Sequence, residues 1–336
     1  MPDTKPTLAV VIPYFQRQAG LLRSAVESVL TQAGPFQVTV IVVDDSSPHP
    51  AEAELDDAWL SRGRVLLIRQ PNAGPSAARN RGLDTLPHGT EYVAFLDSDD
   101  RWTESFASDA HQAFLDGADL FFADTVRFSE AQSRFNWAED GRYRLSAQGH
   151  TAIGQDAQVF RFEGDFLDFL VHRSNVISSA FAYRLGCAPE LRFNRALTYG
   201  EDRLFKLCLA GRCWRIGFSL RVGCTEGPGI NIFDVLNPGS ARALRLASDY
   251  IHVTRILLDS LALPHAQQAW LRRELARCRR EWLFNARHAL RLGTPELAGS
   301  LRLTLQRDPS PRNVNTADGV LPLAVLRDRL RPPPTA

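Results

Sequence analysis

Residues 93–100 constrain the fold of this chain more than any other stretch, because four apolar residues run directly into three carboxylates. The run VAFL at 93–96 is followed by DSDD at 97–100. An uninterrupted apolar run is typical of a buried parallel strand, and the ligand crevice of an open α/β sheet lies beyond the carboxyl ends of its strands. Clustered carboxylates repel one another unless a cation or hydrogen bonds offset the repulsion. We therefore expect Asp97 and Asp99 at a site where a divalent cation holds a diphosphate; an acidic turn that caps the next helix is the alternative.

Two earlier apolar runs end in the same way. The run at 8–12 leads into Pro13-Tyr14-Phe15, and the run at 38–43 leads into Asp44-Asp45. Between the second and third runs, residues 70–82 combine Asn, Gly and Pro, which indicate a turn, with Ser76, which is suited to begin a helix. Arg79 then lies one turn inside this helix, where its guanidinium can pair with Asp97 or with a phosphate.

Five motifs in this order resemble those of the inverting family 2 glycosyltransferases, which have the GT-A fold. They are VIPYF at 11–15, VVDDSS at 42–47, NAGPSAARN at 72–80, DSDD at 97–100 and GED at 200–202. The similarity covers residues 7–235, and CTEGPGINI at 224–232 looks like the corresponding segment of the succinoglycan-type exopolysaccharide branch. The resemblance implies an α/β fold with a Rossmann-like mixed sheet flanked by helices.

The resemblance also implies which residues bind the nucleotide sugar and the metal. Pro13 and Phe15 would lie along the nucleotide base, and Asp45 would accept a hydrogen bond from the uracil or ribose. Asp99 would be the direct ligand of Mn²⁺ or Mg²⁺, while Asp97 would hold the ribose or a metal-bound water. The nucleotide-sugar site would be completed by Asp44, Gly74 and Arg79.

Two details near these motifs carry their own expectations. Asp100 is expected to cap a helix that begins near Trp102, because a carboxylate is favourable at a helix start. The family usually carries Thr, Tyr and Asn after the proline, whereas this chain has Tyr14, Phe15 and Gln16. We therefore expect the contact with the nucleobase to differ in detail.

Inversion at the sugar carbon needs a base on the face opposite the leaving diphosphate, so that the acceptor hydroxyl loses its proton as it attacks. Glu201 and Asp202 precede an apolar-rich helical run at 203–209. We expect Asp202 to be this base, with Glu201 as a supporting or alternative carboxylate. The competing interpretation is an acidic first helical turn stabilised by the helix dipole.

The composition fits a globular enzyme with one catalytic domain and an appendage, since 336 residues exceed one average domain. The sequence contains no run of about 18 apolar residues and no signal pattern at its start. We therefore expect a cytoplasmic protein, because nucleotide sugars are made in the cytoplasm. The five cysteines lack the paired spacing of a zinc site, and we expect reduced structural thiols.

The expected catalytic domain spans residues 1–238, with a nucleotide-binding half at 7–100 and an acceptor half at 103–235. Within it, the hydrophobic pattern predicts helices at 20–32 and 104–116, strands at 65–68 and 119–128, and a hairpin or mobile loop at 129–156. Residues 239–330 are expected to form an Arg-rich helical extension, and residues 331–336 a disordered tail.

The extension differs in charge from the rest of the chain. Residues 241–336 carry sixteen arginines and eight acidic residues, a net charge of +8, whereas residues 1–240 have a net charge of −7. One interpretation is a basic amphipathic surface that makes peripheral contact with the cytoplasmic face of the inner membrane and presents a polyprenyl-diphosphate-linked acceptor. The other is a helical hairpin packed on the catalytic domain, with its arginines in solvent.

These features predict a metal-dependent inverting glycosyltransferase. It would move a hexose from a UDP-sugar to a hydroxyl of a glycan or lipid-linked oligosaccharide in bacterial polysaccharide biosynthesis. A nucleotidyltransferase usually has a Gly-rich phosphate loop after its first strand, and PYFQ at 13–16 is not one. A non-catalytic sugar- or partner-binding module is the second rival, and the joint presence of Asp99, Arg79 and Asp202 argues against it. Nucleic acid is not an expected partner, because basic and aromatic residues are not interleaved in the nucleotide half.

Overall fold

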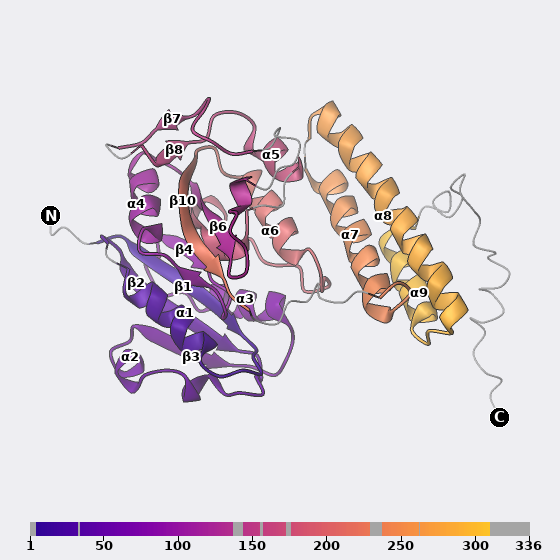
Figure 1. The fold of residues 1–336 in the computed structure, drawn as a ribbon, viewed down its shortest axis with the longest axis horizontal. Coiled ribbons are helices and arrows are strands. Elements are labelled where there is room, and N and C mark those ends of the chain that lie inside the picture. Colours follow the sequence, from indigo (N-terminus) through magenta and orange to yellow (C-terminus); the bar gives the residue numbers. More distant parts are fainter. Residues whose placement is uncertain are drawn as a thin grey trace. The chain divides into compact units, whose positions relative to one another are not determined.

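The structure, a computed structural model, describes residues 5–32, 34–136, 144–154, 157–172, 176–228, 237–261 and 263–309. The chain divides into two compact units. The first lies within Met1–Arg195 and Phe205–Asn231, and the second within Ala196–Leu204 and Ile232–Ala336. The first unit is an α/β structure and the second is built of helices (Figure 1).

Four parallel strands form one side of the sheet in the first unit. They are β1 (Thr7–Tyr14), β2 (Gln37–Asp44), β3 (Val65–Arg69) and β4 (Tyr92–Phe95). Their order in the sheet is β3-β2-β1-β4, and Tyr14 lies opposite Asp44. Because the strands are parallel, the residues that follow β1, β2 and β4 meet at one edge of the sheet. The apolar runs predicted this arrangement.

The other side of the sheet is mixed. The antiparallel strand β9 (Phe181–Arg184) joins β4 to β6 (Leu120–Arg127), and β10 (Ile216–Glu226) runs parallel to β6. The short strands are β5 (Arg101–Trp102), β7 (Thr151–Ala152) and β8 (Val159–Arg161). Ten strands thus form one mixed sheet in the described part of the chain. β7 and β8 pair antiparallel, while residues 137–143 and 155–156 of the expected hairpin or loop lie outside the described residues.

Helices pack on both faces of the parallel strands. Alternate residues of β1, from Leu8 to Tyr14, share one core with α1 (Leu21–Leu30) and α4 (Phe106–Leu115). On the other face α3 (Pro75–Asp84) comes so close that a Cβ at Gly82 would lie 2.3 Å from Val11 Cγ1. A glycine at position 82 is therefore required for this close packing. The remaining helical elements are η1 (Ala51–Ala53), α2 (Asp57–Ser61), η2 (Arg134–Asn136), α5 (Phe166–His172), η3 (Ser178–Ala180), η4 (Leu185–Cys187) and α6 (Glu201–Ala210).

The helix after the acidic motif begins later than predicted. Arg101 and Trp102 form β5, which pairs with β10, and α4 starts only at Phe106 with Ser105 at its N-cap position. The expectation that Asp100 caps this helix is therefore wrong. The extended segment at 101–102 finds its hydrogen-bond partners in the sheet, and local propensity did not reveal this tertiary pairing.

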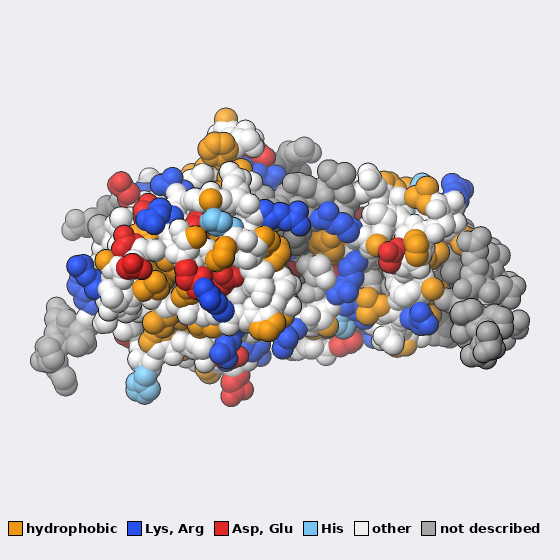
Figure 2. Space-filling view, turned by 90° about the horizontal axis from the view of Figure 1, so that it is seen from below, with side chains coloured by type: hydrophobic (Ala, Val, Ile, Leu, Met, Phe, Trp, Pro, Cys, Tyr) orange, Lys and Arg blue, Asp and Glu red, His pale blue; other side chains and the backbone are white. Residues whose placement is uncertain are grey.

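The second unit has its own hydrophobic core. Its long helices are α7 (Ala241–Ser260), α8 (His265–Leu292) and α9 (Leu297–Arg307). The core includes Leu244, Ile251, Leu275, Trp282, Leu283 and Leu301. Much of the apolar side of α8 therefore packs inside its own unit, and contact of this unit with a membrane stays a prediction. Figure 2 shows basic side chains at several places on the visible face of this unit, beside hydrophobic and acidic ones.

None of the helices within the described ranges is long and apolar enough to cross a membrane. All five cysteines are free. The residues of the expected tail, 331–336, lie outside the described residues.

Candidate active site

The end of β1 turns one aromatic side chain outward and the next one inward. Phe15 is 37% exposed, while Tyr14 is completely buried. The Tyr14 hydroxyl donates a hydrogen bond to Glu54 Oε1 at 3.1 Å, and burial together with the nearby Glu54 carboxylate raises the pKa of Tyr14. The unusual aromatic residue at position 14 therefore belongs to the interior, and Pro13 and Phe15 are the residues of this motif that remain partly accessible.

Asp44 and Asp45, at the end of β2, organise the loops around them. The oxygens of Asp44 accept hydrogen bonds from Ser47 N at 2.7 Å and Ala51 N at 3.0 Å. Asp45 holds the turn before α3, because its Oδ1 accepts from Gln70 Nε2 and Ala73 N and its Oδ2 accepts from Gly74 N, at 2.7–2.9 Å. Both carboxylates are buried. They shape the edge of the sheet, and a contact of either with a nucleotide stays a prediction.

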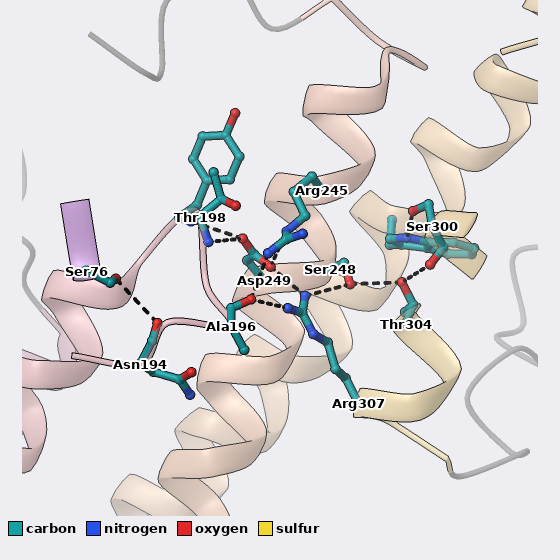
Figure 3. A network of polar contacts seen from close by, with 12 residues as sticks. Ser76, Asn194, Ala196, Thr198, Arg245, Ser248, Asp249, Ser300, Thr304 and Arg307 are labelled. Atoms are coloured by element: carbon teal, nitrogen blue, oxygen red, sulfur yellow. Dashed lines mark hydrogen bonds and ion pairs between the residues drawn. The ribbon is translucent and has the colours of Figure 1, made fainter. Parts of the chain in front are cut away.

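Arg79 and Asp97 meet as the sequence predicted. Helix α3 begins at Pro75 after Gly74, which occupies the N-cap position, so Ser76 lies one residue inside the helix. Arg79 is 5% exposed, and its Nη2 donates to Asp97 Oδ1 at 2.7 Å. The guanidinium also lies over the ring of Phe193, 5.3 Å from its centroid. Ser76 Oγ donates to Asn194 O at 3.4 Å (Figure 3), so residues 193–194 support this helix and its arginine.

The acidic loop after β4 is held from two distant parts of the chain. Ser179, on η3, accepts from Asp97 N at 3.0 Å and donates to Asp100 Oδ2. Gly227, directly after β10, donates its N–H to Asp100 Oδ1 at 2.9 Å. A Cβ at Gly227 would lie 1.8 Å from Asp99 O, so only glycine allows this close contact. These contacts bury Asp100 and leave Asp97 and Asp99 partly exposed.

The acidic loop at 97–100 suits a divalent cation that is also bound by a diphosphate ligand. Burial and the neighbouring charges of Asp97 and Asp99 raise the pKa of Asp100 well above its ordinary value. A cation would offset this concentration of negative charge, and carboxylate oxygens are the ligands that Mg²⁺ and Mn²⁺ prefer. Within the described ranges, no three His, Cys, Asp or Glu side chains group as an ion site. The residues therefore fit a metal held by one or two carboxylates, with other oxygens supplied by a diphosphate.

Glu201 and Asp202 belong to the second unit, where they open α6. Glu201 is 5% exposed, and Asp202 is partly exposed. Gly200, just before them, has a φ of +74°, a conformation that favours glycine. The structure thus brings Asp44, Asp45, Gly74, Arg79 and Asp97 together in the first unit, and the proposed catalytic carboxylates are carried by the second.

Three residues that organise these segments were not identified from the sequence. Ser179 and Gly227 hold the acidic loop, and Asp249 holds the backbone of Thr198 and Tyr199. Each acts across 50 or more residues of sequence. A local pattern gives no sign of such contacts, although Gly227 lies in the CTEGPGINI segment that the resemblance had singled out.

Comparisons with known proteins agree with this description. Residues 9–180 match the family model described as Glycosyl transferase family 2. The chain is 31% identical over 313 residues to the succinoglycan biosynthesis protein ExoW of Rhizobium meliloti (strain 1021), a match that covers 90% of this chain and 94% of that protein. It is 32% identical over 205 residues to the minor teichoic acid biosynthesis protein GgaA of Bacillus subtilis (strain 168), with 59% of this chain and 42% of that protein covered.

Solved structures share the fold. Residues 1–349 of S. aureus TarS in complex with UDP align with a TM-score of 0.57 and 16% identity, covering 90% of this chain and 81% of that one. The mannosyltransferase PcManGT from Pyrobaculum calidifontis, in complex with GDP-Man and Mn²⁺, aligns with a TM-score of 0.54 and 17% identity, covering 97% and 79%. The predicted mixed α/β sheet with C-terminal helices is confirmed.

Proposed function

The chain belongs to glycosyltransferase family 2, and we propose that it moves a hexose from a UDP-sugar, with inversion, to a hydroxyl of a growing bacterial polysaccharide or lipid-linked oligosaccharide. The relative named for succinoglycan biosynthesis, which matches over 90% of this chain, supports polysaccharide as the product class. The UDP complex of TarS supports UDP as the nucleotide. UDP-sugars are made in the cytoplasm, so the proposal puts the enzyme there.

The observation that carries this proposal is the pairing of Arg79 with Asp97 beside the turn that Asp45 fixes. A buried guanidinium at the carboxyl edge of a parallel sheet suits a diphosphate, because its planar N–H groups match phosphate oxygens. Phe15 and Gly74 belong to two motifs that precede Arg79 in the order found in the family. In the proposal, Pro13, Phe15, Asp44, Asp45, Gly74, Arg79 and Asp97 form the nucleotide-sugar site.

The reaction assigns one task to each group of residues. Arg79 and Asp97 orient the donor, and Asp99, with Asp97, would hold Mn²⁺ or Mg²⁺. When bound, the metal neutralises the charge that develops on the leaving diphosphate. Asp202 takes the proton from the acceptor hydroxyl as its oxygen attacks the sugar carbon from the opposite side, with Glu201 as the supporting carboxylate.

Binding and turnover by the full chain test the proposal. Thermal unfolding is measured with UDP, GDP and UDP-sugars, each with and without Mn²⁺, because a ligand that binds the native state raises its apparent stability. We expect the largest stabilisation from UDP or a UDP-sugar together with Mn²⁺, and metal-dependent UDP release from one of the UDP-hexoses. Absence of both effects would refute the proposal, and release of pyrophosphate from a nucleoside triphosphate would indicate a nucleotidyltransferase instead.

A further inference from the structure

Asp249 of α7 is fully buried, and its two carboxylate oxygens serve two different sets of donors. Oδ2 accepts hydrogen bonds from Thr198 N at 2.8 Å and Tyr199 N at 3.0 Å. Oδ1 accepts from Arg245 Nε at 2.8 Å and from Arg307 Nη1. A carboxylate offers about four acceptor positions. All of those on Asp249 are occupied by the amides of residues 198–199 and by two arginines, which the carboxylate joins.

The same two arginines also bind the backbone two residues before Thr198. Arg245 Nη2 and Arg307 Nη2 both donate to Ala196 O, at 2.7 and 2.6 Å. Arg307 is itself fixed by Ser248 Oγ at 3.2 Å, and Ser248 accepts a hydrogen bond from Thr304 at 3.0 Å. Figure 3 shows Asp249 in the middle of this network, between the irregular backbone that carries Ala196 and Thr198 and the helices that carry Arg245 and Arg307. The carbonyl of Ala196 and the amides of Thr198 and Tyr199 are thus bound by side chains of α7 and α9.

The tied segment leads directly to the proposed base. Tyr199 is followed by Gly200 and then by Glu201 and Asp202, the first residues of α6. Tyr250, next to Asp249 on α7, approaches the same place: a Cβ at Gly200 would lie 3.9 Å from Tyr250 Cζ. Burial and the charge of Asp202 raise the pKa of Tyr250, which is consistent with this proximity. Helix α7 therefore contacts the two residues before Gly200 through Asp249 and lies against Gly200 itself through Tyr250.

A buried ionic network of this kind is an expensive way to obtain stability alone. Charges that leave water lose hydration, and apolar packing of similar volume often stabilises a protein as well. The network does provide directional bonds, which fix a backbone in one conformation. We propose that Asp249 is a positioning residue: by binding the 196–199 backbone to α7 and α9, it fixes the place of the catalytic carboxylate at Asp202. This inference rests on the proposed function.

The test compares Asp249→Asn with the wild-type full chain. An amide has one acceptor oxygen, so it can serve the backbone amides or the arginines but not both. UDP release from the UDP-hexose that the wild type turns over is measured with water as acceptor, and UDP affinity is measured by calorimetry with Mn²⁺. We expect kcat to fall by about a hundredfold, as for a misplaced catalytic group, while KM for the donor and Kd for UDP stay unchanged. In an Asp202→Asn background the further loss should be small, because the two residues act as a unit.

Leu283→Ala is the matched control, since it weakens the core of the same helical unit without removing a polar contact. It should lower the unfolding temperature at least as much as Asp249→Asn and leave kcat near the wild-type value. If Asp249→Asn does not fold, Arg245→Gln decides the question, because it removes one donor to Asp249 and one to Ala196 from a partly exposed position. Unchanged kcat in the folded variants, or an equal loss in Leu283→Ala, would overturn the inference. A wild type that neither binds UDP nor releases it would instead refute the proposed function.

Discussion

Arg79, on helix α3, binds Asp97, the strand-end carboxylate eighteen residues later in the chain, with Nη2 and Oδ1 2.7 Å apart. The arginine is almost fully buried, whereas the Asp97 side chain is 40% exposed. Asp97 therefore presents its carboxylate to solvent, while the Arg79 guanidinium that binds it is buried. This geometry suits a ligand that brings both phosphates and a metal.

Replacement of Arg79 by lysine should weaken nucleotide binding. Lysine keeps the charge but loses the planar fork and the contact with the Phe193 ring. Loss of one charge-assisted hydrogen bond costs about 2 kcal/mol, or about thirtyfold in Kd for UDP with Mn²⁺, measured by calorimetry. Arg192→Lys is the control, because Arg192 forms an exposed pair with Asp84; equal affinities for the two variants would contradict the role of Arg79.

Gly227→Ala should disturb the acidic loop directly. The new methyl group would meet Asp99 O, so the loop or the end of β10 must move. We expect the Mn²⁺-dependent part of UDP binding to weaken and the free energy of unfolding to fall by about 1–3 kcal/mol. Gly186→Ala is the matched control, since no atom lies within 4 Å of its added Cβ. Retained Mn²⁺-dependent binding in Gly227→Ala would show that the close contact does not fix Asp99.

Asp202→Asn should abolish transfer without affecting donor binding. The amide cannot accept the proton of the acceptor hydroxyl, and loss of a general base costs about 10²- to 10⁴-fold in rate. Kd for UDP and the unfolding temperature should stay at wild-type values. Glu201→Gln is measured beside it, and a larger loss in that variant would assign the proton transfer to Glu201.

Tyr14→Phe should lower stability and leave the donor site intact. The substitution removes the hydroxyl that donates to buried Glu54, and loss of a hydrogen bond to a buried carboxylate costs about 1–3 kcal/mol. Urea denaturation measures this cost. A raised KM for the UDP-sugar would mean that position 14 contacts the nucleobase after all.

His111 should make the protein less stable in mild acid. Burial lowers the pKa of His111, which lies edge-on to Phe36 with the ring centroids 5.3 Å apart. The unfolded chain then binds this proton more readily, so the free energy of unfolding falls as the pH drops below about 6.5. His111→Gln should remove that part of the pH dependence between pH 7.5 and 5.5 in chemical denaturation. An identical slope for both proteins would contradict the prediction.

Much of the nucleotide half could be predicted because its signals are local. Apolar runs that end in Pro13, Asp44 and Asp97 already define parallel strands and a common edge, and the turn before Arg79 places that residue at the same edge. The direction of the Tyr14 side chain follows from strand alternation, yet the family comparison drew attention to the nucleobase instead. The β5 pairing of Trp102 depends on β10, more than a hundred residues later.

The residues missed from the sequence all act at long range. Ser179 contacts a loop 82 residues before it, and Asp249 binds amides 50 residues away. Such polar contacts leave no periodic pattern in the sequence. A serine or aspartate on a helix that makes a buried contact cannot be distinguished by pattern from one that is exposed on the surface. The apolar face of α8 was visible in the sequence, but whether it meets lipid or its own unit depends on how α7 and α9 fold around it.

The grouping of residues 196–204 with the C-terminal helices has a consequence for protein engineering. Consider a hybrid transferase whose two parents are joined near residue 238, the apparent domain boundary. Its segment 196–204 would come from one parent and the helices that bind this segment would come from the other. Buried Asp249 and the two arginines that bind it would then face a foreign backbone. Exchange of the helical unit should therefore include the nine residues ahead of Phe205, so that the inherited module is discontinuous in sequence.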